Sequence, residues 1–396
     1  MPATIHNDVL VYKGSNLFRQ RLLLSTLSGR TIRIQEIRST HDDPGLREYE
    51  VNLIRLLDKI TNGSRVELSE TGTSLFYQPG ILIGGQVSHS CCTQRGIGYY
   101  LEVLLALGPF CKEPLNAVLQ GVTHHELDVS VDKIKSAALP ILLKFILVDD
   151  GLELKVVRRG APPLGGGEIV FRCPVKRHLR PLQWDKWGLV KRIRGVVYAL
   201  RVSPTMANRV VETAKGVMLN FLPDVYINTD QCRGSNAGKS PGFGISLIAE
   251  TNEKTFYCAE AVSTTFELNY YYCLFLYLIN SNWLSEITLP EDLGKECALK
   301  LLDEIHRGGA VDSSFQWILA LWMALGQKDV SECVTSFIIL FFQKSFYIPY
   351  YFFFVLEVLR SDDDESSDDE ENIPSVQKIK MTCVGIGYVN ISKRTL

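Results

Sequence analysis

Three consecutive glycines, Gly165, Gly166 and Gly167, stand in the segment RGAPPLGGGEI, which runs from residue 159 to 169. Glycines let a backbone approach a ligand closely and present its N–H groups to an anion. Arg158 and Arg159 immediately precede the turn, and guanidinium groups pair well with phosphate. The segment therefore predicts an anion-binding loop. The alternative is a plain tight turn between two strands.

A basic cluster follows between residues 171 and 194, with Asp185 as its only acid. Trp184 and Trp187 are interleaved with the cations, and we expect them to stack on bases or guanidinium groups. The pattern favours an anionic macromolecule, RNA or an acidic protein, over a solvated face. The cluster contains Arg172, Lys176, Arg177, Arg180, Lys186, Lys191, Arg192 and Arg194.

Three further motifs are weaker. GSNAGKS (234–240) resembles a phosphate-binding loop, but Arg233 occupies the position where that motif requires its first glycine. It also precedes a strand pattern, so we expect a loop without nucleotide. Lys328 and Asp329 form a pair that would support acid–base cleavage of RNA if burial shifted their pKa values; a solvated helix end is the alternative. For His124 and His125 a surface turn is favoured over a metal site, and we expect no cofactor.

Alternating helix and strand patterns surround these motifs. Helical periodicity at 18–29, a strand at 30–38 and a helix at 43–63 are followed by similar patterns at 97–108, 113–122 and 126–145. We expect an α+β chain with a large repeat domain at 1–184 and 284–396. A smaller α/β domain is expected to be inserted at 185–283. The repeats are expected at about 8–90, 91–157, and 158–184 together with 284–396.

Charge is segregated along the chain. The formal net charge is -2, with 42 basic and 44 acidic residues, yet eight of the acids lie in DDDESSDDEE at 362–371. The remaining chain is therefore basic, as an RNA-binding protein would be. The segment 334–359 is long and apolar, but Gln343, Lys344 and Pro349 interrupt it, so we expect no membrane span.

RGAPPLGGGEI is similar to the signature of the RNA 3'-terminal phosphate cyclase family. GSNLFRQRLLLSTLSGRTIRI (14–34), TGTSLFYQPG (71–80) and VSVDKIKSAALPILLKF (129–145) also resemble family segments. The resemblance covers about residues 8–330 and returns at 381–396. It implies three repeats resembling the C-terminal domain of translation initiation factor 3, with the smaller domain inserted in the third. Residues 334–375, which contain the acidic loop 361–372, do not resemble the family and form an atypical segment.

The family's enzymes use ATP to cyclise an RNA 3'-phosphate through an adenylate carried on a histidine. The resemblance, anchored on Gln316, puts Asp312 at that position, and His306 is the nearest histidine. A nucleophilic mechanism cannot proceed without its nucleophile. The family's Gly-Gly-Gln becomes Gly14-Ser15-Asn16, while Arg19 remains, as a further anion-binding candidate.

These departures resemble the non-cyclising branch of the family. That branch implies a nucleolar protein of the small-subunit processome, needed for early pre-rRNA cleavages toward 18S rRNA. Its implied partners are a ribosome-assembly GTPase, pre-rRNA and a small nucleolar ribonucleoprotein. The alternatives are a pre-rRNA endonuclease that uses Lys328 and Asp329, and an active cyclase that uses His306.

Overall fold

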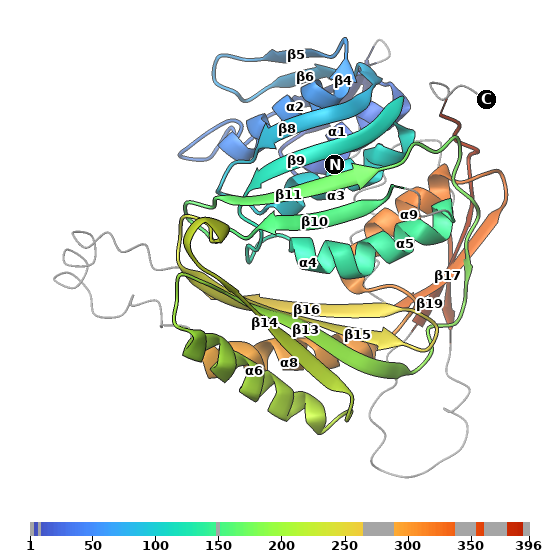
Figure 1. The fold of residues 1–396 in the computed structure, drawn as a ribbon. Coiled ribbons are helices and arrows are strands. Elements are labelled where there is room, and N and C mark those ends of the chain that lie inside the picture. The colour runs from blue at the N-terminus through green and yellow to red at the C-terminus, as the bar shows by residue number, and fades with distance from the viewer. Residues whose placement is uncertain are drawn as a thin grey trace.

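The computed structural model describes residues 4–6, 9–147, 151–263, 289–336, 354–359 and 378–390. This part of the chain contains four sheets of four or five strands, with helices packed on them (Figure 1). The prediction of an α+β chain is confirmed, because parallel and antiparallel pairs occur in each of these sheets and helices connect their strands.

The first sheet has the strand order β1-β2-β3-β6-β5. β2 and β3 are parallel and are joined by α1 (Phe18–Ser28), which ends where Gly29 adopts a left-handed φ of 70°. α2 (Glu48–Ile60) follows β3 and leads to the antiparallel strands. The strands are β1 (Thr4–His6), β2 (Val9–Lys13), β3 (Ile32–Gln35), β5 (Arg65–Leu68) and β6 (Leu75–Gln78), and a separate short pair is β4 (Thr61–Asn62) with β7 (Ile81–Leu82).

The second sheet has the order β10-β11-β9-β8. α3 (Ile97–Leu107) joins the parallel strands β8 and β9. α4 (Val131–Lys133), a π-helical turn at Ile134–Ala138 and α5 (Leu139–Ile146) then form one helical stretch that leads to β10. The strands are β8 (Gly84–Ser90), β9 (Glu113–Gly121), β10 (Glu153–Arg158) and β11 (Gly167–Cys173).

The third sheet joins segments that lie far apart in the sequence. Its order is β12-β17-β19-β18, with β12 parallel to β17 and the other pairs antiparallel. α9 (Gln316–Leu325) precedes β17. All three sheets place their four shared strands in the same order, which is first, second, fourth and third along the chain. The strands here are β12 (Gln183–Trp184), β17 (Val330–Ser336), β18 (Phe354–Leu359) and β19 (Lys378–Val384).

The fourth sheet has the order β14-β13-β15-β16 and carries α6 (Pro204–Leu219) and α8 (Pro290–Arg307) on one face (Figure 1). α6 begins cleanly because Ser203 accepts a hydrogen bond from the backbone N–H of Thr205, and Pro204 suits the first helical position. The strands are β13 (Val190–Leu200), β14 (Val225–Cys232), β15 (Gly242–Thr251) and β16 (Phe256–Val262).

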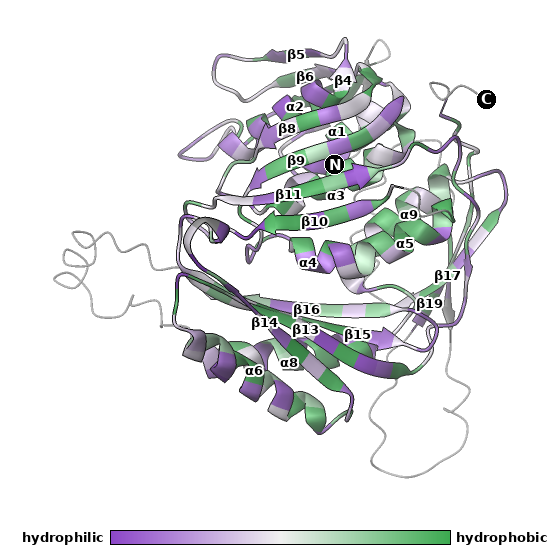
Figure 2. Ribbon diagram, viewed as in Figure 1, coloured by the Kyte–Doolittle hydropathy of each residue, from purple (hydrophilic) through white to green (hydrophobic). Residues whose placement is uncertain are grey.

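The hydrophobic residues form two main cores. One is shared by the helices and strands of the first three sheets, and every residue of α3 is buried within it. The other belongs to the fourth sheet with α6 and α8. Figure 2 shows that α9 is mostly hydrophobic, whereas α6 alternates hydrophilic and hydrophobic residues, as a helix with one solvent face should.

Two expected boundaries differ from the structure. Residues 158–173 were expected to open the third repeat, but β11 pairs with β9 along its whole length, from Gly167 opposite Gly121 to Cys173 opposite Leu115. They therefore complete the second sheet. Residues 284–396 were expected to belong to the large domain, but the apolar face of α8, with Leu293, Cys297 and Leu301, packs into the core of the fourth sheet.

Part of the atypical segment 334–375 lies outside the described residues, as does the acidic loop 361–372. Within the described residues, no helix has the length and hydropathy that crossing a membrane requires.

Leu104 tests the shared core. Its side chain is fully buried in α3, so Leu104→Ala should lower the free energy of unfolding by about 2–5 kcal/mol through lost burial and the cavity left behind. Leu299 on α8 is 51% exposed, and Leu299→Ala should change stability by less than about 0.5 kcal/mol. Urea unfolding of both variants measures the difference, and equal losses would contradict the assignment of α3 to the core.

Candidate functional site

Two loops from different sheets meet at a cavity of about 410 Å³. One is the glycine loop, residues 159–166, between β10 and β11. The other is the 234–240 loop, between β14 and β15. The carboxyl ends of the parallel strands β8 and β9 complete the wall. Three cations line this cavity, Arg158, Arg201 and Lys239, and its lining contains no carboxylate.

Hydrogen bonds hold the two loops together. The backbone N–H of Lys239 donates to the carbonyl of Gly165 at 2.9 Å, and the N–H of Leu164 donates to Ser240 Oγ at 3.0 Å. Arg201 Nε donates to the carbonyl of Gly238 at 2.7 Å. Each loop is therefore fixed by the other, and the cavity has a defined wall on both sides.

The glycines of the signature serve two different purposes. A Cβ on Gly160 would lie 2.2 Å from the backbone nitrogen of Gly167, so the two chain segments can approach only if no side chain stands there. Gly166 has a φ of 84°, which L-residues rarely adopt, and it forms part of the cavity wall. The close backbone approach that the glycines predict therefore occurs, at Gly160, between two segments of the protein itself.

The electrostatics of the cavity suit an anion. Lys239 is exposed, and Arg201 Nε is bonded to a neutral carbonyl, so both side chains keep an uncompensated charge within the described part. Arg158 is shared with Glu168, whose carboxylate lies 3.4 Å away and also accepts from Gln120. Burial raises the pKa of the Cys91 thiol at the wall, so a thiolate nucleophile is not favoured there.

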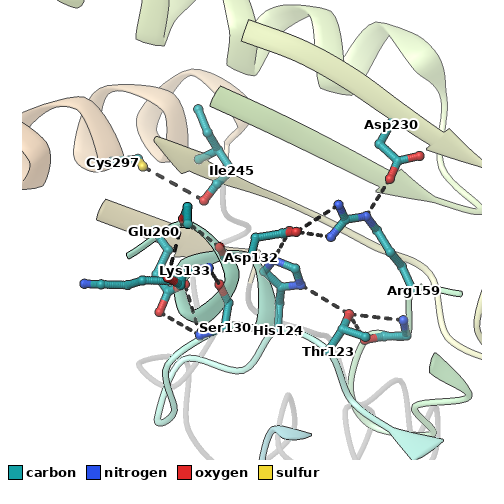
Figure 3. Close-up of polar contacts among 12 residues, drawn as sticks. Thr123, His124, Ser130, Asp132, Lys133, Arg159, Asp230, Ile245, Glu260 and Cys297 are labelled. Atoms are coloured by element: carbon teal, nitrogen blue, oxygen red, sulfur yellow. Dashed lines mark hydrogen bonds and ion pairs between the residues drawn. The ribbon is translucent and has the colours of Figure 1, made fainter. Parts of the chain in front are cut away.

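Arg159 lies beneath the glycine loop rather than in the cavity. Its guanidinium contacts Asp132 of α4 at 2.5 Å and Asp230 of β14 at 2.6 Å, and its side chain is only 7% exposed (Figure 3). An anion partner was expected for this arginine, and the partners present are two carboxylates of the protein. Arg159 thereby connects the second sheet to the fourth.

Asp132 is the centre of this network. Figure 3 shows it between His124 and Arg159, and His124 Nε2 lies 2.9 Å from its carboxylate. Burial alone would raise the pKa of Asp132, but hydrogen bonds and charge from His124 and Arg159 outweigh it, and the pKa is lowered well below its usual value. His124 is therefore a buried partner of Asp132, whereas His125 lies in a turn and accepts from Leu127 N–H.

Asp312, which the resemblance is expected to put at the position of a nucleophilic histidine, is completely buried. Its carboxylate accepts from the backbone N–H groups of Cys258 and Ser314 at 2.8 and 3.0 Å, and it lies 3.2 Å from Lys133 Nζ. Burial would lower the pKa of Lys133, but the charges of Asp312 and Glu260 reverse the effect and raise it. The Asp312 side chain is thus a fully satisfied structural group.

Arg19 also has its charge paired within the protein. It lies 2.5 Å from Glu102, donates to the carbonyl of Tyr99 at 3.1 Å, and covers the rings of Tyr99 and Trp317. Trp317 Nε1 donates to the other oxygen of Glu102 at 3.2 Å. Burial raises the pKa of Glu102 despite these partners.

The predicted basic cluster divides into paired and unpaired residues. Arg172 pairs with Glu153, Arg192 with Glu250 and Arg194 with Asp224. Within the described part no ion pair is formed by the other cations, which lie on the surface or partly buried: Lys176, Arg177, Arg180, Lys186 and Lys191. The cluster therefore keeps a positive surface, reduced by three carboxylates.

The two tryptophans of the cluster differ from the expectation of base stacking. Trp184 is only 6% exposed, and the ammonium of Lys144 lies 3.8 Å from its ring centroid. Trp187 is partly buried and covered in the same way by Lys378 at 4.1 Å. Both rings already have cationic partners within the protein. They lie at the edge of the shared core rather than on an open surface.

Lys328 and Asp329 are both exposed after α9. Asp329 accepts from the backbone N–H of Val330 at 2.8 Å, which fits a turn. His306 is likewise exposed, in the last turn of α8. Among the described residues, no group of three or more His, Cys, Asp or Glu side chains is placed to hold a metal ion.

The 234–240 loop and Arg201 are the residues that sequence reasoning missed. The spacing of this loop does not fit a phosphate-binding loop, and the structure confirms that a strand, β15, follows it from Gly242. Its contact with the glycine loop is made across two sheets. The sequence signal that could have indicated this contact is that both loops contain several glycines next to a cation.

A family model described as "RNA 3'-terminal phosphate cyclase" matches residues 10–351. A Drosophila melanogaster protein named "Probable RNA 3'-terminal phosphate cyclase-like protein" is 54% identical over 404 residues, which cover 100% of both chains. The Homo sapiens "RNA 3'-terminal phosphate cyclase-like protein" is 49% identical over 97% of each chain. The Schizosaccharomyces pombe "rRNA processing protein rcl1" is 40% identical, also over 97% of each.

Asp132 predicts a specific acid dependence of stability. Because its pKa in the folded state lies below the ordinary value of 3.8, its contribution is present above that pH and is lost as the pH falls toward the folded-state value. Asp132→Asn should therefore be less stable than the native chain at pH 7, and the gap should narrow below about pH 4. Denaturant unfolding from about pH 7 to pH 3 measures it, with the exposed Asp58→Asn as control. A gap independent of pH would refute the assignment.

Proposed function

The chain belongs to the RNA 3'-terminal phosphate cyclase family, and on that premise we propose that it acts in ribosomal RNA processing without cyclising RNA ends. In this proposal it is a binding module for RNA and protein. The printed name of the Schizosaccharomyces pombe relative, an rRNA processing protein, supports the process. The surroundings of Asp312 support the absence of cyclisation.

Asp312 is the observation that carries the proposal. A covalent adenylate requires a nucleophilic side chain that ATP can reach. Asp312 has no exposed surface, and its two oxygens are taken by two backbone N–H groups and Lys133. His306, the residue that an active cyclase would have to use instead, lies exposed at the end of a different helix.

The finer role follows from the resemblance to the non-cyclising branch. We propose that the chain works in the small-subunit processome, in the nucleolus, during early cleavages toward 18S rRNA. Its partners would be a ribosome-assembly GTPase, pre-rRNA and a small nucleolar ribonucleoprotein. The unpaired surface cations of the basic cluster, such as Lys176, Arg177 and Arg180, supply charge for an anionic partner.

We also propose that the first three sheets are three repeats resembling the C-terminal domain of translation initiation factor 3. Their identical strand order supports this. The fourth sheet would be the domain inserted in the third repeat, since it lies between β12 and β17 in the sequence. The inserted unit would extend past residue 283 to include α8.

The sequence also predicts, as an alternative function, a pre-rRNA endonuclease that uses Lys328 and Asp329. The exposure of Lys328 and Asp329 offers neither residue the burial on which that hypothesis depended. No specific contact in the described part favours it over a binding module.

Incubation of the purified chain with radiolabelled ATP and an RNA 3'-phosphate tests the absence of cyclisation. We expect no cyclic phosphate and no covalent adenylate, with an active cyclase as the positive control. Asp312→His should not restore activity, and it should cost about 3–5 kcal/mol because Lys133 would lose a buried partner. Adenylate formation by the native chain, abolished in His306→Ala, would overturn the proposal.

Affinity purification of the full-length chain tests the partners. A GTPase of ribosome assembly and pre-rRNA should be recovered together. The variant Arg177→Glu/Arg180→Glu, with two charges reversed on exposed residues, should recover at least tenfold less RNA while keeping its fold. Lys215→Glu on α6 serves as the matched control, and an equal loss in both would remove the basic cluster from consideration.

A further inference from the structure

We propose that the cavity between the glycine loop and the 234–240 loop holds one phosphate group of a bound RNA strand, with Lys239 and Arg201 as its cationic anchors. This inference rests on the proposed function, because it takes RNA as the carrier of the phosphate. The site lies apart from Asp312, which neither lines the cavity nor contacts its loops.

The charge of the cavity is the first argument. Lys239 is exposed and forms no ion pair within the described part of the chain. Arg201 uses Nε to hold the Gly238 carbonyl, which leaves its terminal nitrogens to donate to a ligand. Arg158 is partly offset by Glu168 at 3.4 Å. The lining therefore carries a clear positive excess, which an anion would neutralise.

The shape of the wall is the second argument. A Cβ on Gly166 would lie 3.0 Å from both Cγ and the backbone nitrogen of Lys239, so a side chain there would crowd the lysine that lines the cavity. Because Gly166 has no side chain, a tetrahedral group can approach the backbone at this part of the cavity wall. The backbone of Lys239 is held by the bond to Gly165, which places this residue in the lining of the cavity.

The place of the cavity in the fold is the third argument. It lies at the carboxyl ends of the parallel strands β8 and β9, which is where ligands bind in sheets with parallel strands. Thr93 and Gln120 come from these ends and line the cavity with a hydroxyl and an amide that can donate to phosphate oxygens. Thr93 and Gln120 belong to the second sheet and its loops, whereas Lys239 and Arg201 belong to the loops of the fourth sheet.

The volume favours a nucleotide over an isolated ion. At about 410 Å³ the cavity falls within the usual range for pockets that enclose small organic ligands. Inorganic phosphate would leave most of it empty. A nucleotide unit would place its phosphate against the cations while its sugar continues to the opening. An RNA strand presents such a unit with further phosphates for the surface cations outside.

Fluorescence anisotropy with a labelled single-stranded RNA 12-mer, titrated with the full-length chain, tests the site. Lys239→Ala should weaken binding about tenfold, as expected for one charge-assisted contact. The slope of log Kd against log salt between about 50 and 200 mM should fall by about 0.7, the value for one phosphate of a single strand. Lys239→Arg should retain most of the affinity, and Arg201→Gln, which keeps a donor for Gly238, should behave like Lys239→Ala.

The matched control is Lys215→Ala, which removes an exposed cation of α6 outside the cavity and should leave affinity and slope unchanged. Thermal melting of each variant shows whether the fold persists. Unchanged affinity and slope in Lys239→Ala, with the native chain binding RNA, would overturn this inference and leave the proposed function standing. No RNA binding by the native chain would overturn both.

A second titration separates the sources of the phosphate. AMP and inorganic phosphate are added as competitors to the native chain with bound RNA. Displacement of RNA by AMP at millimolar concentration in the native chain, together with the Lys239→Ala loss, supports a shared phosphate site. Binding of AMP through Lys239 with no effect of Lys239→Ala on RNA affinity would assign the cavity to a free nucleotide and overturn the inference.

Discussion

The ion pairs of Arg159 are the interaction on which the arrangement of this molecule depends. One guanidinium contacts Asp132 from the second-sheet unit and Asp230 from the fourth sheet, at a junction between two separate cores. The side chains of Arg159 and Asp132 are largely removed from water, which is costly unless each charge is paired and hydrogen-bonded, and the half-exposed Asp230 and the buried His124 complete their pairing. Because Gly160 follows Arg159 directly, the same pairs also fix the start of the glycine loop.

The neighbouring residue of α4 extends this junction to the third sheet. Lys133 follows Asp132 and lies against Asp312, whose backbone partners are Cys258 of β16 and Ser314 before α9. Two successive residues of one short helix thus contact two different charged groups, Arg159 and Asp312. The Asp312 carboxylate is consequently integrated into the packing through its contacts with Lys133 and two backbone N–H groups.

Much of the local structure could be predicted from the sequence, and most long-range pairing could not. Periodicity and Gly29 located α1, and alternation located β3, because these depend on neighbouring residues. Residues 158–184 were expected to begin the third repeat, yet residues 167–173 pair with β9 in the second sheet, since a strand's sequence does not show which strand it pairs with. Arg159 was expected to bind an external anion and instead pairs with two carboxylates of the protein, since carboxylates and phosphates attract a guanidinium alike. The cavity needed Lys239 and Gly166 to meet across two sheets.

The third sheet has a consequence for how the chain acquires its structure. β12 is parallel to β17, and Leu182 N–H donates to Ser331 Oγ across 149 positions of sequence. During synthesis the first strand of this sheet must wait for its partner on the order of ten seconds at ordinary elongation rates. The fourth sheet can assemble in that interval, because its strands are close in sequence. β12, which contains Trp184, therefore has no strand partner until translation passes β17.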